Sequence, residues 1–250
     1  MTNIKDLISV IMPSFNSNEY IPYAINSVLN QTYEKWELLI IDNNSNDATI
    51  ETVNEFIKKN NKIKLIKSNY NNGPGFARNL GIKQSKGKYL AFLDSDDFWD
   101  SKFLESLIYF LKINKYYFVY CPYFIYTNKN SKLNNVLPYA CESNILKSNP
   151  LSCLAILIEK DKFNFKFDTI MKTHEDIDMW IKIINLNGIA HRYNEPLAYY
   201  RQRKHSLSSK KLRNAIDRWR FLRINMKFNL LKSLYYFLSY IFYGLNKYFF

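Results

Sequence analysis

The stretch Tyr89-Leu-Ala-Phe-Leu-Asp-Ser-Asp-Asp-Phe-Trp99 decides the fold of this chain. Five apolar residues are followed at once by three carboxylates, Asp94, Asp96 and Asp97. A short apolar run with such an abrupt end is typical of a buried strand. Crowded carboxylates repel one another unless a cation lies among them, and ligands of open α/β sheets bind beyond the carboxyl ends of the strands. The stretch therefore predicts a metal and phosphate site, although the acidic residues could instead cap a helix beginning near Ser101.

Strand and helix patterns alternate around that stretch. Short apolar runs predict strands at residues 7–12, 36–41, 63–66 and 89–93. Helical spacing predicts helices between them, at residues 20–29, 49–57 and 76–84. This alternation predicts a Rossmann-like, mostly parallel α/β sheet flanked by helices. Further along the chain we expect strands at 116–126, 153–158 and 196–200, a loop at 128–135 and a helix at 176–186.

Composition bounds the class of protein. The 250 residues suffice for one α/β domain with an appendage, and 47% hydrophobic residues exclude a disordered chain. Three cysteines (Cys121, Cys141 and Cys153) lack the spacing of a metal site or a disulfide framework, which favours a reducing cytosol. The first strand pattern begins so close to Met1 that we expect no signal peptide.

The net charge of +13 is concentrated at the C-terminal end. Residues 201–250 hold twelve Lys and Arg against one acid, whereas residues 1–200 hold 23 basic and 21 acidic residues. We therefore expect a nearly neutral catalytic domain at 1–208 and a basic, aromatic helical tail at 209–250.

Five segments carry a family resemblance. Four of them combine a strand or turn with polar groups, at residues 9–16, 40–47, 72–81 and 93–97. The fifth, His174-Glu-Asp-Ile-Asp-Met-Trp180, is an acidic helix start. In this order and spacing they closely resemble the inverting family 2 glycosyltransferases of the GT-A fold, of the bacterial surface-polysaccharide type. The resemblance spans roughly residues 7–208.

The resemblance implies a nucleotide-sugar site. Pro13 and Asn16 would line the nucleotide pocket, and Asp42 would hydrogen-bond the base, most often uracil in this family. Arg78 fits a contact to phosphate or nucleotide. For Asp42 the alternative is a residue that only forms a turn.

The resemblance also implies a metal. Asp94 and Asp96 match the Asp-x-Asp positions of the family, with Asp94 near the ribose and metal and Asp96 holding the Mn²⁺ or Mg²⁺ that bridges the diphosphate. Such a metal stabilises the departing nucleoside diphosphate. For Asp97 we favour a helix cap over a place in the metal shell.

The resemblance makes Asp176 the general base, with Glu175 as its catalytic neighbour. An acceptor hydroxyl is a poor nucleophile at neutral pH, so inversion needs a carboxylate within hydrogen-bond reach. Two of the three acids Glu175, Asp176 and Asp178 are expected to be structural or to orient the acceptor. The alternative for the group is an acidic helix start that interacts with the helix dipole.

One segment departs from the family pattern. Relatives often carry Tyr-Arg-x-His after the last core strand, whereas Arg203 stands at the His position here and His205 follows two residues later. Arg201, Arg203 and Lys204 could clamp the diphosphate, with or instead of a metal-binding His. We favour a surface loop for His205.

The tail has a basic amphipathic pattern. Apolar residues recur at helical spacing from Leu212 onward, and the positions between them are largely filled by Arg213, Arg218, Arg220, Arg223, Lys227 and Lys232. This pattern is typical of a helix that lies in a membrane interface; packing on the catalytic domain or a second subunit is the alternative. The apolar run at 233–245 is too short to span a bilayer.

We therefore expect a hexosyltransferase that moves a sugar, from a UDP-sugar by preference, to a glycan or lipid-linked saccharide for cell-surface polysaccharide. It would work in the cytoplasm at the inner face of the cell membrane. A nucleotidyltransferase would want a basic Gly-rich loop after the first strand, where Pro13 to Glu19 supplies none. A nucleic-acid-binding module fits the pI of about 9.4 but gives the carboxylates no role, so we expect no nucleic-acid partner.

Overall fold

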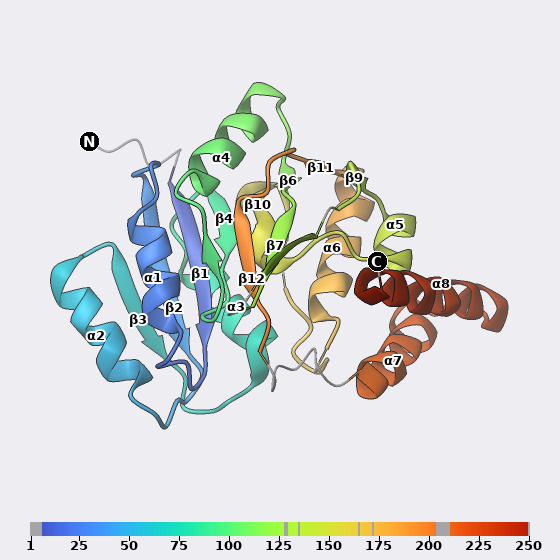
Figure 1. The fold of residues 1–250 in the computed structure, drawn as a ribbon, viewed down its shortest axis with the longest axis horizontal. Helices are drawn as coiled ribbons and strands as arrows, with labels where there is room; N and C mark the ends of the chain where they lie inside the picture. Colours follow the sequence, from blue (N-terminus) through green and yellow to red (C-terminus); the bar gives the residue numbers. More distant parts are fainter. Residues whose placement is uncertain are drawn as a thin grey trace.

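The computed structural model describes residues 7–127, 130–134, 136–164, 166–171, 173–203 and 211–249. Figure 1 shows a central sheet with helices around it, and two C-terminal helices beside α5 and α6 at one end of the molecule. The expected α/β fold with helices flanking the sheet is confirmed.

The N-terminal half alternates strand and helix as expected. Its elements are β1 (Ile8–Ser14), α1 (Ile21–Leu29), β2 (Trp36–Asp42), α2 (Thr49–Lys59), β3 (Ile63–Lys67), α3 (Gly73–Gln84) and β4 (Tyr89–Phe92). Strands β1, β2 and β4 are buried along their whole length, which explains their continuous apolar runs. The four strands pair in parallel in the order β3-β2-β1-β4.

The second half completes the large sheet and adds a small one. Its elements up to the tail are β5 (Phe98–Trp99), α4 (Phe103–Ile113), β6 (Phe118–Tyr120), β7 (Tyr123–Tyr126), β8 (Ser131–Asn134), β9 (Tyr139–Ala140), α5 (Glu142–Lys147), the short 3₁₀ turns η2 (Cys153–Ala155) and η3 (Lys160–Lys162), β10 (Ile156–Glu159), α6 (Glu175–Asn187), β11 (Ala190–Arg192) and β12 (Ala198–Arg201). The large sheet continues as β4-β10-β6-β11-β9, and the small one has the order β5-β12-β7-β8. Strand β10 is antiparallel to both of its neighbours.

Two local predictions were wrong, and the strand expected at 153–158 begins only at Ile156, after η2. The single strand expected at 116–126 is two strands in different sheets, because Pro122 has no N–H for a ladder and separates β6 from β7. The loop expected at 128–135 contains β8, which pairs with β7 at the edge of the small sheet. Its largely exposed, polar residues give no apolar pattern.

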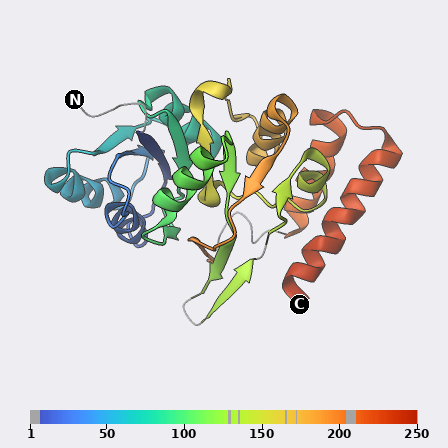
Figure 2. The same cartoon turned by 90° about the horizontal axis from the view of Figure 1, so that it is seen from above.

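The tail forms α7 (Lys211–Arg220), a π-helical turn η5 (Phe221–Asn225) and α8 (Leu230–Phe249). Figure 2 shows α7 and α8 side by side, with the end of the chain on α8. Phe221, Leu222 and Ser233 are buried, so one side of the tail packs on the protein. Among the described residues, no helix is both long and apolar enough to cross a membrane.

Arg218 differs from the other basic residues of the tail pattern, because it does not lie on a solvated face. Its side chain is completely buried, and its guanidinium lies against the rings of Phe221 (5.6 Å to the centroid) and Tyr240 (5.2 Å). It donates hydrogen bonds to the carbonyls of Ile145 (3.2 Å) and Leu146 (2.5 Å) at the end of α5. The last carbonyls of a helix lack partners within the helix, so a cation is stabilised there.

Candidate active site

The carboxyl ends of β1, β2 and β4 meet at one edge of the sheet. Ser14 at the end of β1 lies opposite Asp42 at the end of β2, and Asp94 follows β4 directly after Leu93. The loops that leave these strands are tied together. Ser17 and Ser95 share a hydrogen bond between hydroxyls (2.7 Å).

Asn16 is held by the loop after β2. Its backbone N–H donates to Oγ of Ser45 (2.9 Å), and its side-chain Oδ1 accepts from the N–H of Asn46 (2.9 Å). Its φ of +47° is left-handed, a conformation that Asn tolerates better than most residues. Pro13 precedes this turn and is buried within β1. Pro13 and Asn16 thus lie at the same edge of the sheet as Asp42, and their role in a nucleotide pocket stays a prediction.

Asp42 has an unused acceptor. The carboxylate is buried, and Oδ2 accepts from the N–H of Ser45 (3.0 Å). Within the described residues, Oδ1 of Asp42 has no partner, nor have Oγ of Ser14 and Oδ1 of neighbouring Asn43. Leaving buried polar atoms unpaired costs free energy, and three of them at one strand edge suit a ligand that offers N–H and O–H donors.

Arg78 lies between Asp94 and Glu175, and its expected contact to phosphate or nucleotide stays a prediction. Its Nη2 donates to Oδ1 of Asp94 (2.8 Å) and its Nη1 to Oε1 of Glu175 (3.0 Å), while only 5% of its side chain is exposed. The nearby charges of Asp94 and Glu175 help to keep the pKa of Arg78 well above its ordinary value despite burial. Arg78 thus bridges the strand-edge acids and the start of α6, and its two terminal nitrogens already have partners.

Asp96 and Arg203 form an ion pair that the sequence pattern did not predict. Burial raises the pKa of Asp96, the neighbouring charge of Asp94 raises it further, and Arg203 opposes both. The guanidinium of Arg203 also lies over the ring of Tyr20 (5.1 Å to the centroid). A cation thus stands beside the Asp96 carboxylate.

The donor set fits a hard divalent metal. Asp94 and Asp96 offer carboxylate oxygens and repel each other, and Mg²⁺ and Mn²⁺ prefer oxygen ligands. In the described part of the chain, no three His, Cys, Asp or Glu side chains form a cluster that could hold a metal by themselves. Two carboxylates are nevertheless sufficient where substrate phosphates and water complete the shell, as is usual for Mg²⁺.

Asp97 is not the helix cap that we favoured. Helix α4 begins at Phe103 without a side-chain cap, and the buried carboxylate of Asp97 accepts instead from the backbone N–H of Arg201 (2.8 Å). Arg201 in turn donates from Nε to the carbonyl of Asp96 (2.9 Å). Its guanidinium lies 5.2–5.4 Å from four aromatic rings: Tyr20, Tyr23, Phe98 and Tyr126. Arg201 therefore braces the loop that carries the acids, and the expected clamp on a diphosphate stays a prediction. His205 and Lys204 lie outside the described residues.

The acids of α6 have three different surroundings. Glu175 is buried against Arg78, and Asp178 is buried and paired with Lys182 (2.5 Å). Asp176 is half-buried. Burial and the charge of Asp176 raise the pKa of Glu175 to about 7, against the influence of Arg78, and burial likewise raises the pKa of Asp176. Glu175 and Asp178 are thus each paired with a cation, and Asp176 is the least buried of the three acids; which of them is the base stays a prediction.

The structure shows what the residues around the Gly-rich turn contact. Asn79 holds the segment before α6 through two hydrogen bonds to the backbone of Phe167 (2.7 and 2.8 Å). A Cβ on Gly75 would lie 3.2 Å from both the Asp168 carbonyl and Cγ of Glu175, so glycine permits the close approach of α3. The thiol of Cys153 is buried, which raises its pKa, and the nearby charge of Arg78 acts to lower that pKa. The Gly-rich turn was the only signal in the sequence for these contacts.

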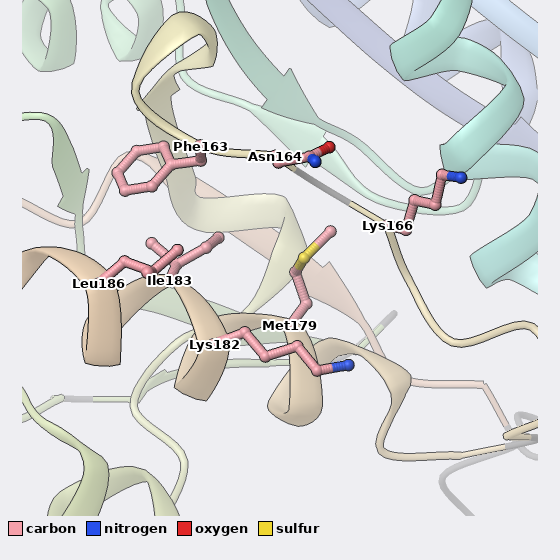
Figure 3. A pocket seen from close by; sticks show the side chains of 7 residues that line it. All are labelled: Phe163, Asn164, Lys166, Met179, Lys182, Ile183 and Leu186. Atoms are coloured by element: carbon pink, nitrogen blue, oxygen red, sulfur yellow. The ribbon is translucent and has the colours of Figure 1, made fainter.

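A separate pocket lies between α6 and the residues Phe163, Asn164 and Lys166 (Figure 3). It has a volume of about 260 Å³, and Lys166, Met179, Lys182 and Ile183 are among its lining residues. None of the site residues expected from the sequence lines it. It is therefore distinct from the strand-edge site.

Replacing Arg78 with methionine should destabilise the protein by about 3 kcal/mol, because breaking a buried ion pair leaves its partners uncompensated. The figure is at the low end because the Asp94 side chain is 35% exposed and is partly solvated by water. Urea unfolding would measure the change, with Lys83→Met, an exposed position on the same helix, as the control. Equal stability of the two variants would show that the bridge contributes little.

The fold is the GT-A fold that is found among nucleotide-sugar transferases. The mannosyltransferase PcManGT from Pyrobaculum calidifontis, solved in complex with GDP-Man and Mn²⁺, superposes with a TM-score of 0.73 at 16% sequence identity. That likeness covers 93% of this chain and 70% of the mannosyltransferase chain.

The sequence matches the family described as Glycosyl transferase family 2 over residues 9–171. The chain is 36% identical over 244 residues to WfgD of Escherichia coli, named as a UDP-Glc:alpha-D-GlcNAc-diphosphoundecaprenol beta-1,3-glucosyltransferase, covering 96% of this chain and 94% of the relative. It is 31% identical over 244 residues to TuaG of Bacillus subtilis, whose name assigns it to teichuronic acid biosynthesis, covering 96% of each. The chain therefore belongs to glycosyl transferase family 2 and is a glycosyltransferase. This decides the enzyme class that the sequence pattern had left open.

Proposed function

We propose that this chain is an inverting, metal-dependent hexosyltransferase that moves a sugar from a UDP-sugar to a lipid-linked saccharide during synthesis of a cell-surface polysaccharide. The observation that carries the proposal is the Arg78 bridge, which ties Asp94 on the donor side to Glu175 beside the expected base. A single-displacement transfer needs its leaving group and its base held at a fixed separation, and one buried guanidinium supplies that connection.

The donor would lie along the strand edge. Oδ1 of Asp42 would accept the N–H of a uracil ring, which gives this buried oxygen the partner that it lacks. Pro13 and Asn16 would form the adjacent wall. WfgD, whose name specifies UDP-Glc, supports uridine as the nucleoside.

Asp94 and Asp96 would hold a Mn²⁺ or Mg²⁺ together with the diphosphate oxygens. When bound, such a metal neutralises the negative charge that develops on the departing nucleoside diphosphate. The crystallisation of a fold neighbour with Mn²⁺ supports this assignment. With Asp96 on the metal, Arg203 would lose its ion-pair partner and could meet a phosphate oxygen instead.

Asp176 would act as the general base. It would take the proton of the acceptor hydroxyl while that oxygen bonds to the anomeric carbon, and the bond from that carbon to the phosphate oxygen would break with its electron pair leaving on the diphosphate. One displacement inverts the configuration, so an α-linked donor yields a β-linkage. The beta-1,3 linkage in the name of WfgD agrees with this outcome.

The acceptor and the location are proposed together. The names of the two relatives point to polysaccharide synthesis, and that of WfgD to a diphosphoundecaprenol-linked sugar. Helix α8 exposes an apolar stripe at helical spacing, made of Leu231, Leu234, Tyr235, Leu238, Ile241 and Phe242. A stripe near basic residues is suited to the interface of an anionic bilayer. We therefore place the enzyme at the cytoplasmic face of the membrane, with no nucleic-acid partner.

The function is tested by incubating the full chain with Mn²⁺, a synthetic GlcNAc-diphospholipid acceptor, and UDP-, dTDP- and GDP-sugars in turn. Release of nucleoside diphosphate would be measured for each donor. We expect release from one UDP-hexose, faster with the acceptor than without it. If a folded enzyme released no nucleoside diphosphate but bound nucleic acid with strong salt dependence, the proposal would be wrong.

The membrane assignment predicts a second result. Leu238→Glu together with Phe242→Glu should weaken partitioning to phosphatidylglycerol vesicles at least tenfold, because each buried apolar side chain contributes about 1.5–3 kcal/mol. Ile113→Glu, an equally apolar residue that is 60% exposed on α4, is the matched control. Unchanged sedimentation of the double variant with vesicles would rule out this face as the anchor.

A further inference from the structure

The turn at Thr173 and His174, directly before the Glu-Asp pair, has a backbone that needs support. His174 has φ +66° and ψ +10°, in the left-handed region that non-glycine residues rarely occupy. Such conformations cost about 1–3 kcal/mol and persist where their surroundings hold them in place. The carbonyl of His174 accepts from the N–H of Asp178 (3.0 Å), so the turn also sets where α6 begins.

The C-terminal tail supplies that support. Oγ1 of Thr173 donates to Oδ2 of Asp217 on α7 (3.0 Å) and lies 3.0 Å from Nδ1 of His174. Because the single hydroxyl proton of Thr173 goes to Asp217, Nδ1–H of His174 must be the donor in the second bond. Burial, together with the nearby Arg218 charge, lowers the pKa of His174 to about 4, so the ring is neutral at pH 7.

The His174 ring also packs against the tail. Its centroid lies 6.1 Å from that of Phe221 in η5, with the planes 14° apart, and 6.4 Å from that of Tyr240 on α8. The turn therefore contacts three elements, α7, η5 and α8, all beyond residue 210. This contact is of the kind that the alternative reading of the tail, packing on the catalytic domain, had predicted.

Arg218 fixes the position of α7. Its bonds to Ile145 and Leu146 join α7 to α5, and α5 packs against α6. Burial lowers the pKa of Arg218 to about 10, while the charges of Tyr240 and Asp176 act to raise it, so the side chain stays cationic at neutral pH. A buried cation that bonds to helix-end carbonyls strongly constrains the packing of the elements that it joins.

We infer that Asp217 and Arg218 are positioning residues, through which α7 holds the His174 turn and so sets the place of Glu175 and Asp176. The inference rests on the proposed function, because it takes Asp176 as the base. The tail then supports the active centre in addition to offering a surface to membranes. It affects the rate of the transfer step and not the binding of the donor.

The test compares four variants of the full chain: Thr173→Val, Arg218→Met, Arg218→Lys and, as the control on the exposed side of α7, Arg220→Met. Thr173→Val keeps the shape of the side chain, removes only the hydroxyl, and leaves α7 intact. Displacing a catalytic group by about 1 Å can cost about 100-fold in rate. We expect kcat to fall 10- to 100-fold in Thr173→Val and Arg218→Met, with KM for the donor within twofold of wild type. Arg218→Lys should recover part of the loss, and Arg220→Met should change neither parameter.

A second readout does not depend on activity. Amide hydrogen exchange of the peptide spanning 173–178 should be faster in Thr173→Val and Arg218→Met than in Arg220→Met, with β1, β2 and β4 unchanged. Wild-type kcat in both variants, or unchanged exchange at 173–178, would overturn the inference while leaving the transferase assignment standing. If wild type transferred no sugar, the proposed function would fail, and the exchange measurement would still decide whether α7 holds the turn.

Discussion

Asp176→Asn should lower kcat by about 10²- to 10⁴-fold, the usual contribution of a positioned general base. The amide has nearly the same size and cannot take a proton, so the affinity for donor should stay within a few-fold of wild type. The matched control is Asp178→Asn, two residues further along α6, whose acid is already paired with Lys182. A kcat above a tenth of the wild-type value in Asp176→Asn would show that another residue acts as the general base.

The same pair of acids predicts a pH dependence. Burial and the neighbouring Asp176 charge raise the pKa of Glu175 to about 7, and burial raises that of Asp176 above its ordinary value. A base accepts a proton only when it is ionised, so turnover should fall as the pH is lowered through the raised pKa of Asp176 and level off above it. In Asp176→Asn the loss of that charge should lower the pKa of Glu175. A wild-type rate that falls only at the ordinary pKa of an aspartate, about 3.9, would contradict a base with a raised pKa.

The second large loss of activity is expected for Asp96→Asn. Stabilising the charge on the leaving diphosphate is worth several kcal/mol, so we expect about a 10³-fold loss of kcat at fixed Mn²⁺ and a higher Mn²⁺ concentration for half-maximal rate. Asp100→Asn, four residues along the same segment, should respond to Mn²⁺ as wild type does.

The ion pair between Arg203 and Asp96 places a second candidate cation beside the expected metal site, and removal of the metal distinguishes the two. If wild type kept full activity in EDTA, the guanidinium would be the cation that neutralises the diphosphate, and the metal assignment would be wrong. If EDTA abolished activity and Mn²⁺ restored it, Arg203 would be an auxiliary contact.

Strong local patterns made the N-terminal half of the fold predictable. Strands β1, β2 and β4 are buried throughout, so each is a continuous apolar run that ends in polar residues. The same ends place Asp42 and Asp94 at one edge of a parallel sheet. In the second half, β9 has two residues and β11 has three, which is too few for a periodic signal.

Long-range pairing limited what could be predicted of the site. Arg78 and Glu175 lie 97 residues apart, and nothing in either segment indicates the other. Arg218 shows the same limit. An arginine in an amphipathic helix is normally solvated, and only the free carbonyls at the end of α5 and two aromatic rings make its burial tolerable. The resemblance indicated the kinds of residue in the site, and their partners had to come from the structure.

The anomeric configuration of the product tests the central claim most directly. With the donor that supports release of nucleoside diphosphate, the new glycosidic bond would be read from its anomeric proton coupling by NMR. One displacement, driven from the Asp176 side and ending on the diphosphate held near Asp94 and Asp96, predicts a β-linkage from an α-linked donor. An α-linkage would mean two displacements or front-side attack, and it would contradict the arrangement of base and leaving group described above.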